Sequence, residues 1–303
     1  MTKPFSERPS FLLVGATGRV GRLLCHHWPA NPHTPQLLPV RRRAKAGAGD
    51  GLVWSPLDGP DALLRYLARP VAGPPPVALA MLAGVTPGPG VDSAALSLNR
   101  TLAEACLDAA RQAGIGRVLL ASSAAVYGLD PDGLALDETA PTTPISAYGR
   151  AKLDMEAAAP PARDAGLNVS VLRIGNVAGA DALLGPLTGL HPDHHPPLRI
   201  DAFADGLGPL RSYIGAASLA RVLATLSCLP GPVPDVLNIA APDPVRMTAL
   251  ARAAGWPFLL TPAPAHARQV VTLDCHRLHA ICPEPPFENL PETMVQNWKE
   301  SWH

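Results

Sequence analysis

Residues 11–21, Phe-Leu-Leu-Val-Gly-Ala-Thr-Gly-Arg-Val-Gly, decide the fold that is predicted for this chain. Four apolar residues predict a strand, and glycines follow at Gly15, Gly18 and Gly21. These glycines permit a tight turn, bring the backbone close to a pyrophosphate and let the next helix pack on the sheet. A strand followed by such a turn and a helix is typical of a dinucleotide-binding unit. The residues expected to bind the cofactor here are Gly15, Thr17, Gly18, Arg19, Val20 and Gly21.

Beyond this stretch, short apolar runs alternate with segments of helical periodicity. The alternation predicts an α/β protein with a doubly wound, Rossmann-like parallel sheet and a small C-terminal substrate lobe. Expected strands cover residues 11–14, 36–40, 52–54, 77–83, 117–122, 169–174 and 236–239. Expected helices cover residues 19–28, 60–68, 92–113, 147–158, 216–228, 245–254 and 290–300. We expect residues 1–175, with 213–240 returning to them, to form the dinucleotide-binding domain, and residues 176–212 and 241–303 to form the substrate lobe.

Composition narrows the class of protein. Of the 303 residues, 47% are hydrophobic and 17% charged, which indicates an ordered globular chain. The formal net charge is zero, which argues against a broad nucleic-acid surface, and no run of about 18 apolar residues predicts a membrane span. The five cysteines form no CxxC pair, which favours reduced thiols. We therefore expect a cytoplasmic protein that acts on a small-molecule substrate, without nucleic acid or membrane as a partner.

The residues that follow the second expected strand bear on the type of cofactor. A free ribose 2′-hydroxyl is usually bound by an acidic residue at this place. Here residues 36–40 lead instead into Arg41, Arg42 and Arg43. Guanidinium groups favour a 2′-phosphate, so we expect NADP, with NAD as the alternative; a solvated basic loop would also explain the arginines. Asp58 is a candidate partner for the adenine amino group, although a helix N-cap would explain it as well.

Tyr148 and Lys152 lie in Tyr-Gly-Arg-Ala-Lys, 25 residues after Ser123. Residues four apart on a helix project from one face, so the lysine ammonium can favour the tyrosine phenolate. Such a tyrosine is a usable acid or base near neutral pH, and a nearby serine can hold the substrate oxygen. These three residues are the candidate catalytic group.

These motifs resemble the extended short-chain dehydrogenase/reductase superfamily, in its NAD-dependent epimerase/dehydratase branch, over most of the chain. The matching blocks are Gly15 to Gly21, Asn99 in Ser-Leu-Asn-Arg-Thr-Leu, residues 121–128, Tyr148 to Lys152, residues 172–179 and Asp205 to Arg211. The resemblance implies that Tyr148 transfers the proton and that Lys152 binds the nicotinamide ribose. It implies that Ser123, or less favourably Ser122, binds the reacting oxygen. Further expected cofactor contacts are Asp58, Ala83 and Asn99; a purely structural role is equally open for Asn99.

The resemblance also bears on the reaction and the substrate. The family's 4,6-dehydratases carry an Asp-Glu pair where this chain has Ala124 and Ala125, which argues against dehydration and leaves epimerisation and carbonyl reduction. Asn176 and Arg211 match residues that contact the substrate of nucleotide-sugar enzymes, Arg211 at its diphosphate. By contrast, Gly215 and Ser218 replace a family histidine and aspartate, which argues against a nucleotide-sugar substrate. The alternative function is a non-catalytic NADP-binding regulatory or interaction protein of the same fold.

Two further expectations concern metal and assembly. His191, His194 and His195 are close in sequence, but their proline-rich setting favours a loop, and we expect no metal. The helices expected at 92–113 and 147–158 are those through which relatives dimerise, so the resemblance implies a homodimer.

Overall fold

The computed structural model describes residues 8–43, 51–69, 74–128, 134–265, 267–283, 287 and 289–302. The chain divides into two compact units. The first comprises Met1–Leu129, Pro141–Arg173 and Ala220–Leu237, and the second comprises Asp130–Ala140, Ile174–Leu219 and Asn238–His303. That the first unit binds a dinucleotide and the second the substrate stays a prediction.

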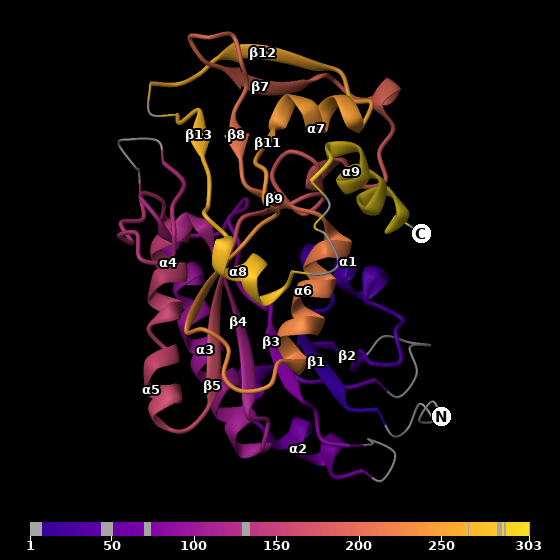
Figure 1. The fold of residues 1–303 in the computed structure, drawn as a ribbon, viewed down its shortest axis with the longest axis vertical. Coiled ribbons are helices and arrows are strands. Elements are labelled where there is room, and N and C mark those ends of the chain that lie inside the picture. The colour runs from indigo at the N-terminus through magenta and orange to yellow at the C-terminus, as the bar shows by residue number, and fades with distance from the viewer. Residues whose placement is uncertain are drawn as a thin grey trace. The chain divides into compact units, whose positions relative to one another are not determined.

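A six-stranded sheet is built mainly from the first unit, with the order β10-β5-β4-β3-β1-β2 (Figure 1). Its strands are β1 (Ser10–Val14), β2 (Gln36–Val40), β3 (Ala78–Met81), β4 (Arg117–Ser123), β5 (Asn168–Ile174) and β10 (Val236–Ile239). β1 pairs in parallel with both β2 and β3, and β3 pairs in parallel with β4. The chain order reverses at β1, and ligands of open α/β sheets bind beyond the carboxyl ends of the strands at such a point. The predicted α/β fold with a parallel sheet is confirmed.

The helices of the first unit begin and end close to the predicted positions. They are α1 (Arg19–His27), α2 (Asp61–Leu67), α3 (Ser93–Gln112), α4 (Ala147–Glu156) and α5 (Ala159–Asp164), and α6 (Ala216–Cys228) starts in the second unit. The Asp92 side chain caps α3 by accepting a hydrogen bond from the Ala95 N–H at 2.8 Å. Gly114, with φ +68°, ends this helix, and the Ile115 N–H reaches back to the Ala110 carbonyl at 2.9 Å. This closure satisfies the last carbonyls of the helix.

Two predicted elements differ in extent. α4 ends at Glu156 and a separate α5 begins at Ala159, because Pro160 and Pro161 suit the first turn of a helix but not its interior. The strand expected at 52–54 is reduced to one bridge, Arg41↔Val53. Leu52 and Trp54 are buried as in a strand, but the 3-10 turn at Pro56–Asp58 leaves no room for a longer ladder.

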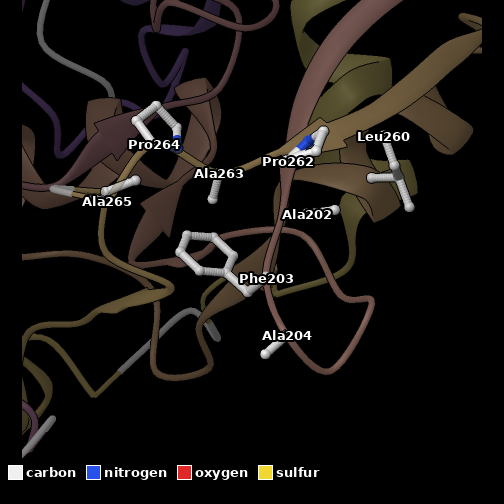
Figure 2. A pocket seen from close by; sticks show the side chains of 9 residues that line it. Ala202, Phe203, Ala204, Leu260, Pro262, Ala263, Pro264 and Ala265 are labelled. Carbon is white, nitrogen blue, oxygen red and sulfur yellow. The ribbon is translucent and has the colours of Figure 1, made fainter.

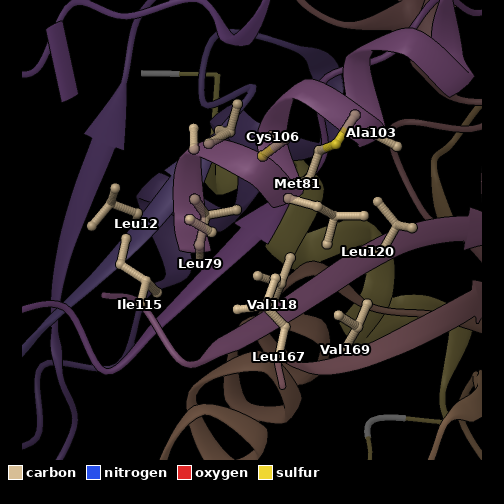
Figure 3. Close-up of a cluster of buried hydrophobic side chains, with 14 of the residues drawn as sticks. Leu12, Leu79, Met81, Ala103, Cys106, Ile115, Val118, Leu120, Leu167 and Val169 are labelled. Carbon is tan, nitrogen blue, oxygen red and sulfur yellow. The ribbon is translucent and has the colours of Figure 1, made fainter. Parts of the chain in front are cut away.

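The core of the first unit lies between the sheet and the α3–α4 layer. α3 packs against α4, and both helices contact β4. Figure 3 shows Leu79, Met81, Val118 and Leu120 from β3 and β4 facing Cys106 of α3 among other apolar side chains. This packing fixes the position of α4 relative to the end of β4.

The second unit contains small sheets and short helices. Its strands are β6 (Asn176–Val177), β7 (Leu198–Ala202), β8 (Leu210–Arg211), β9 (Tyr213–Ile214), β11 (Val245–Arg246), β12 (Phe258–Pro262) and β13 (Val270–Val271). Its helices are α7 (Met247–Ala253), α8 (His276–Ile281) and α9 (Pro291–Glu300). β6 pairs with β9, β7 with β12, and β8 lies between β11 and β13. Within the described residues, no helix combines the length and apolar character needed to cross a bilayer.

Candidate active site

The structure brings Ser123, Tyr148 and Lys152 together within the first unit. Ser123 is the last residue of β4, and α4 starts at Ala147 beside it. The Ser146 hydroxyl caps α4 by accepting a hydrogen bond from the Gly149 N–H at 2.9 Å. A Cβ on Gly149 would lie 2.9 Å from the Cβ of Pro144, so glycine allows the first turn to approach its neighbours closely. Tyr148 is thereby held in the first turn and Lys152 one turn later.

The Ser123 side chain lies beside the Tyr148 hydroxyl and lowers the pKa of the phenol. Burial raises the pKa of Tyr148 above its usual value, and the Ser123 side chain offsets part of that rise. The Ser123 oxygen also accepts a hydrogen bond from the Ala125 N–H at 3.2 Å, which orients the hydroxyl. Without a positive charge nearby, this phenol would therefore stay protonated at neutral pH.

Lys152 supplies such a charge from a buried position. Its Nζ lies 6.0 Å from the centre of the Tyr148 ring, and the residue is 6% exposed. The ammonium donates to the carbonyl of Ala121 at 2.7 Å and to the Met155 sulfur at 3.7 Å. Burial lowers the pKa of Lys152 to about 8, although the Glu156 carboxylate acts in the opposite direction. An ammonium has three donors, so one remains for a ligand.

Asn99 of α3 is fully buried, and its amide is already paired. Its Oδ1 accepts from the Val85 N–H at 2.7 Å, and its Nδ2 donates to the Val85 carbonyl at 3.0 Å. A Cβ on Gly84 would lie 2.8 Å from Asn99 Oδ1 and 3.7 Å from Lys152 Nζ, so the loop after β3 passes close to both. The hydrogen bonds to Val85 indicate that Asn99 holds the loop after β3 in place. A cofactor contact by Asn99 stays a prediction.

The glycine turn has the close backbone contacts that the sequence predicts. Gly15 has φ +96°, and a Cβ there would lie 2.5 Å from the Ala83 nitrogen. A Cβ on Gly21 would lie 2.7 Å from the Cα of Ala16, because α1 packs tightly on the turn. A Cβ on Gly18 would meet only the Gly15 oxygen, at 3.3 Å, and no side chain caps the first turn of α1. The first N–H groups of the helix are thus suited to an anionic ligand.

The other predicted cofactor residues lie around this turn. The Ala83 N–H donates to the Val14 carbonyl at 3.0 Å. Arg41 follows β2 and is half-buried, whereas Arg42 is exposed. Asp58 is exposed in the 3-10 turn before α2. The N-cap of α2 is Pro60, so an N-cap role does not explain Asp58. Thr17, Arg19 and Val20 lie in the turn and the first turn of α1.

The predicted substrate residues lie in the second unit. Asn176 of β6 pairs with Tyr213, and its backbone N–H donates to the Ser212 carbonyl at 2.9 Å. The Arg211 guanidinium donates to the carbonyls of Leu210, Gln269 and Arg268 at 2.8, 2.8 and 2.7 Å. Burial lowers the pKa of Arg211. Three of its five N–H groups are thus used by the backbone, which leaves fewer for a diphosphate than sequence reasoning assumed.

Sequence reasoning missed a pocket of about 570 Å³ in the second unit. Its lining includes Phe203, Leu260, Pro262 and Pro264 from β7, β12 and the segments after them (Figure 2). Apolar residues at these positions look like ordinary core in the sequence. They line a pocket because β7 and β12 form a separate two-stranded sheet.

Sequence reasoning also missed a buried ion pair between Glu156 and Arg173. Arg173 Nη2 lies 2.9 Å from Glu156 Oε2, and the two side chains are 8% and 9% exposed. The spacing of Glu156 could have identified it from the sequence. It lies four residues after Lys152 and eight after Tyr148, which places the three residues on one helix face. Among the described residues, no group of three His, Cys, Asp or Glu is arranged to hold a metal ion.

Residues 11–216 match the model of the NAD-dependent epimerase/dehydratase family. UDP-glucose 4-epimerase of Rhizobium meliloti (strain 1021) is 32% identical over 206 residues, which are 65% of this chain. That alignment spans 60% of the Rhizobium protein, less than two thirds of its length.

Solved structures share the fold. The UDP-glucose 4-epimerase of Thermus thermophilus in complex with NAD has a TM-score of 0.70 at 21% identity, over 96% of this chain and 99% of that one. RMD from Pseudomonas aeruginosa in complex with NADPH has a TM-score of 0.73 at 20% identity, with the same coverage. Because the family model matches more than half of its residues, the chain belongs to the NAD-dependent epimerase/dehydratase family.

Proposed function

We propose that this protein is a nicotinamide-dependent epimerase of a nucleotide sugar, with Tyr148, Lys152 and Ser123 as its catalytic residues. The observation that carries the proposal is the meeting of these three side chains at the carboxyl end of β4. The similarity to a UDP-glucose 4-epimerase supports the reaction class. Ala124 and Ala125 provide neither acid nor base for dehydration.

In this proposal Tyr148 moves the proton of the reacting hydroxyl, and the Ser123 hydroxyl donates a hydrogen bond to the same substrate oxygen. The buried phenol needs help to ionise, and a unit charge at about 6 Å stabilises an anion by roughly 3 kcal/mol at an effective dielectric constant of 20. That is about two pKa units for Tyr148. The bound nicotinamide would supply hydride acceptance and return at the sugar carbon. The uncapped first turn of α1 would hold its pyrophosphate.

Carbonyl reduction uses the same residues, so product analysis decides between the two reactions. Incubation with UDP-glucose and catalytic NAD or NADP should give the 4-epimer without net change in cofactor redox state. Tyr148→Phe should lower kcat by at least about 100-fold while cofactor affinity is retained. Tyr66→Phe is the matched control, because Tyr66 lies on α2 and is not one of the proposed catalytic residues.

Two outcomes would contradict the proposal. Stoichiometric oxidation of NADPH with a carbonyl compound would favour a reductase. Cofactor binding without turnover on UDP-glucose, UDP-N-acetylglucosamine or a carbonyl panel would favour the non-catalytic regulator.

We propose NADP as the preferred cofactor, with NAD as the alternative. The support is that Arg41 and Arg42, rather than a carboxylate, follow β2. Fluorescence titration should show tighter binding of NADPH than NADH, and Arg41→Ala combined with Arg42→Ala should remove the difference. Arg100→Ala, on α3 and paired with Glu104, is the control. Equal affinities in the unaltered protein would reject the NADP preference.

The substrate would bind to the second unit, with Asn176 and Arg211 as proposed contacts. The pocket at Phe203 supports a flat, partly apolar group such as a nucleobase, because an aromatic ring offers a stacking surface. Phe203→Ala should raise the KM for UDP-glucose more than it lowers kcat. An unchanged KM would exclude this pocket as the base site.

We further propose a cytoplasmic homodimer. The five free cysteines suit a reducing compartment, and α3 carries the exposed Leu98, 44% accessible, for a helix-to-helix contact. Light scattering after size-exclusion chromatography should give twice the 31.6 kDa chain mass. A monomer at micromolar concentration would refute the dimer.

A further inference from the structure

The side chains on three successive turns of α4 contact the last three residues of β4. Tyr148 lies beside Ser123, Lys152 donates to the Ala121 carbonyl at 2.7 Å, and Glu156 accepts from the Ser122 hydroxyl at 2.5 Å. The spacing of four residues places all three on one helix face. Glu156 therefore belongs to the same contact surface as the two proposed catalytic residues of the helix.

A second cation meets Glu156 from β5. Arg173 donates to the carboxylate through Nη2 at 2.9 Å and through Nε at 3.2 and 3.3 Å to the two oxygens. Its Nη1 donates to the Tyr127 hydroxyl at 3.1 Å, and its guanidinium carbon lies 4.9 Å from the centre of the Tyr127 ring. These contacts hold the carboxylate in place, with Arg173 on one side and the Lys152 side chain one helical turn away.

The Glu156 carboxylate is the negative charge that acts on the buried Lys152 ammonium. Burying an ammonium without a counter-charge costs free energy, and the cost appears as a lowered pKa. Burial lowers the pKa of Lys152 to about 8, and Glu156 is the charged group that raises it. The groups around the ammonium are Tyr148 and Glu156 on α4 and, beyond the carboxylate, Arg173 and Tyr127. With Glu156 neutral, Lys152 would have another cation and no anion among these neighbours.

We propose that Glu156 is a positioning residue that keeps Lys152 an ammonium, because Ser122 and Arg173 hold its buried carboxylate one helical turn from Lys152. This rests on the proposed function, in which the Lys152 ammonium favours the Tyr148 phenolate. Glu156 contacts neither substrate nor cofactor in this scheme. It acts through Lys152.

Direct titration of Lys152 tests this role without substrate or turnover. The chain has only four lysines, so a ¹³Cε-lysine NMR spectrum is simple, and Lys152→Arg assigns the signal. Glu156→Gln should lower the pKa of Lys152 by about one unit. Loosened packing would shift the pKa in the opposite direction, towards the ordinary value of about 10.4. Glu156→Asp keeps the charge, so the pKa of Lys152 in that variant should stay close to its value in the unaltered protein. Glu104→Gln alters an exposed pair and should leave the pKa of Lys152 unchanged.

A neutral residue at 156 removes the carboxylate that the buried Arg173 contacts, and this loss could prevent folding. The combined variant Glu156→Gln with Arg173→Gln removes both charges of the pair and keeps the test possible. Because Arg173 lies beyond the carboxylate, its loss should raise the pKa of Lys152 less than the loss of Glu156 lowers it, so a lower pKa of Lys152 in the folded variant supports the proposal. An unchanged or higher pKa overturns it. Because the titration needs no reaction, absent epimerase activity would refute the proposed function and leave this result intact.

Discussion

Lys152 Nζ lies 2.7 Å from the Ala121 carbonyl oxygen, so Lys152 of α4 is hydrogen-bonded to β4, the strand that ends in Ser123. Because this bond joins the helix to β4, the positions of Tyr148 and Ser123 depend on it as well. The bond also keeps an ammonium in a buried position, where its charge is costly.

The burial of Lys152 predicts a dependence of stability on pH. Its folded-state pKa of about 8 lies below the ordinary lysine value of 10.5, so the unfolded chain binds more protons between these values. The free energy of unfolding should therefore rise with pH through this window, by about 2 kcal/mol between pH 7 and pH 9.5 from this residue. Urea unfolding at both pH values measures the rise. Lys152→Met should lack it; an equal rise in that variant would contradict the prediction.

Gly15 combines positive φ with a lack of space, and the two effects can be separated. Gly59 also has positive φ, +81°, but nothing within 4 Å of its Cβ position. Gly59→Ala should cost about 1–3 kcal/mol of unfolding free energy, from the backbone conformation alone. Gly15→Ala should cost clearly more and abolish cofactor binding, because its Cβ would lie 2.5 Å from the Ala83 nitrogen. Urea unfolding and cofactor titration measure both. Equal costs would show that the Gly15 turn adjusts without strain.

Asn99 should contribute more to stability than to chemistry. Asn99→Ala would leave the Val85 N–H and carbonyl without the Asn99 amide and cost about 2–6 kcal/mol, since each unpaired group costs about 1–3 kcal/mol. Ser97→Ala, on the exposed side of α3, is the control. Chemical unfolding of the three proteins measures the difference. A variant of normal stability with a large loss of kcat would instead support the proton-path role.

Tyr213 and Asp181 form a half-buried hydrogen bond of 2.8 Å in the second unit. Burial raises the pKa of Asp181, and the Tyr213 hydroxyl lowers it by stabilising the carboxylate. Tyr213→Phe should therefore raise the pKa of Asp181 further and destabilise the protein at pH 7 by about 1–3 kcal/mol. The loss should shrink as pH falls and the carboxyl binds a proton. Thermal unfolding at pH 7 and pH 4.5 measures this; a loss that is independent of pH would point to packing rather than the hydrogen bond.

The sequence alone predicted local features because local physics governs them. Asp92 and Gly114 bound α3 through capping that any chain with those residues can form. The strand of residues 11–14 and its glycine turn predicted the α/β fold, and four-residue spacing placed Tyr148 and Lys152 on one helix face. The family and its parallel sheet followed from these motifs.

Tertiary structure alone decided which partners these side chains have. Glu156 meets Arg173 from another strand, and Arg211 gives its donors to the carbonyls of Arg268 and Gln269, 57 and 58 residues away. Burial depends on how β4, α4 and β5 pack, and no periodicity encodes it for a single polar side chain. The motif identified Lys152, but only the packing around it shows that its charge is costly and that the Glu156 carboxylate offsets part of that cost.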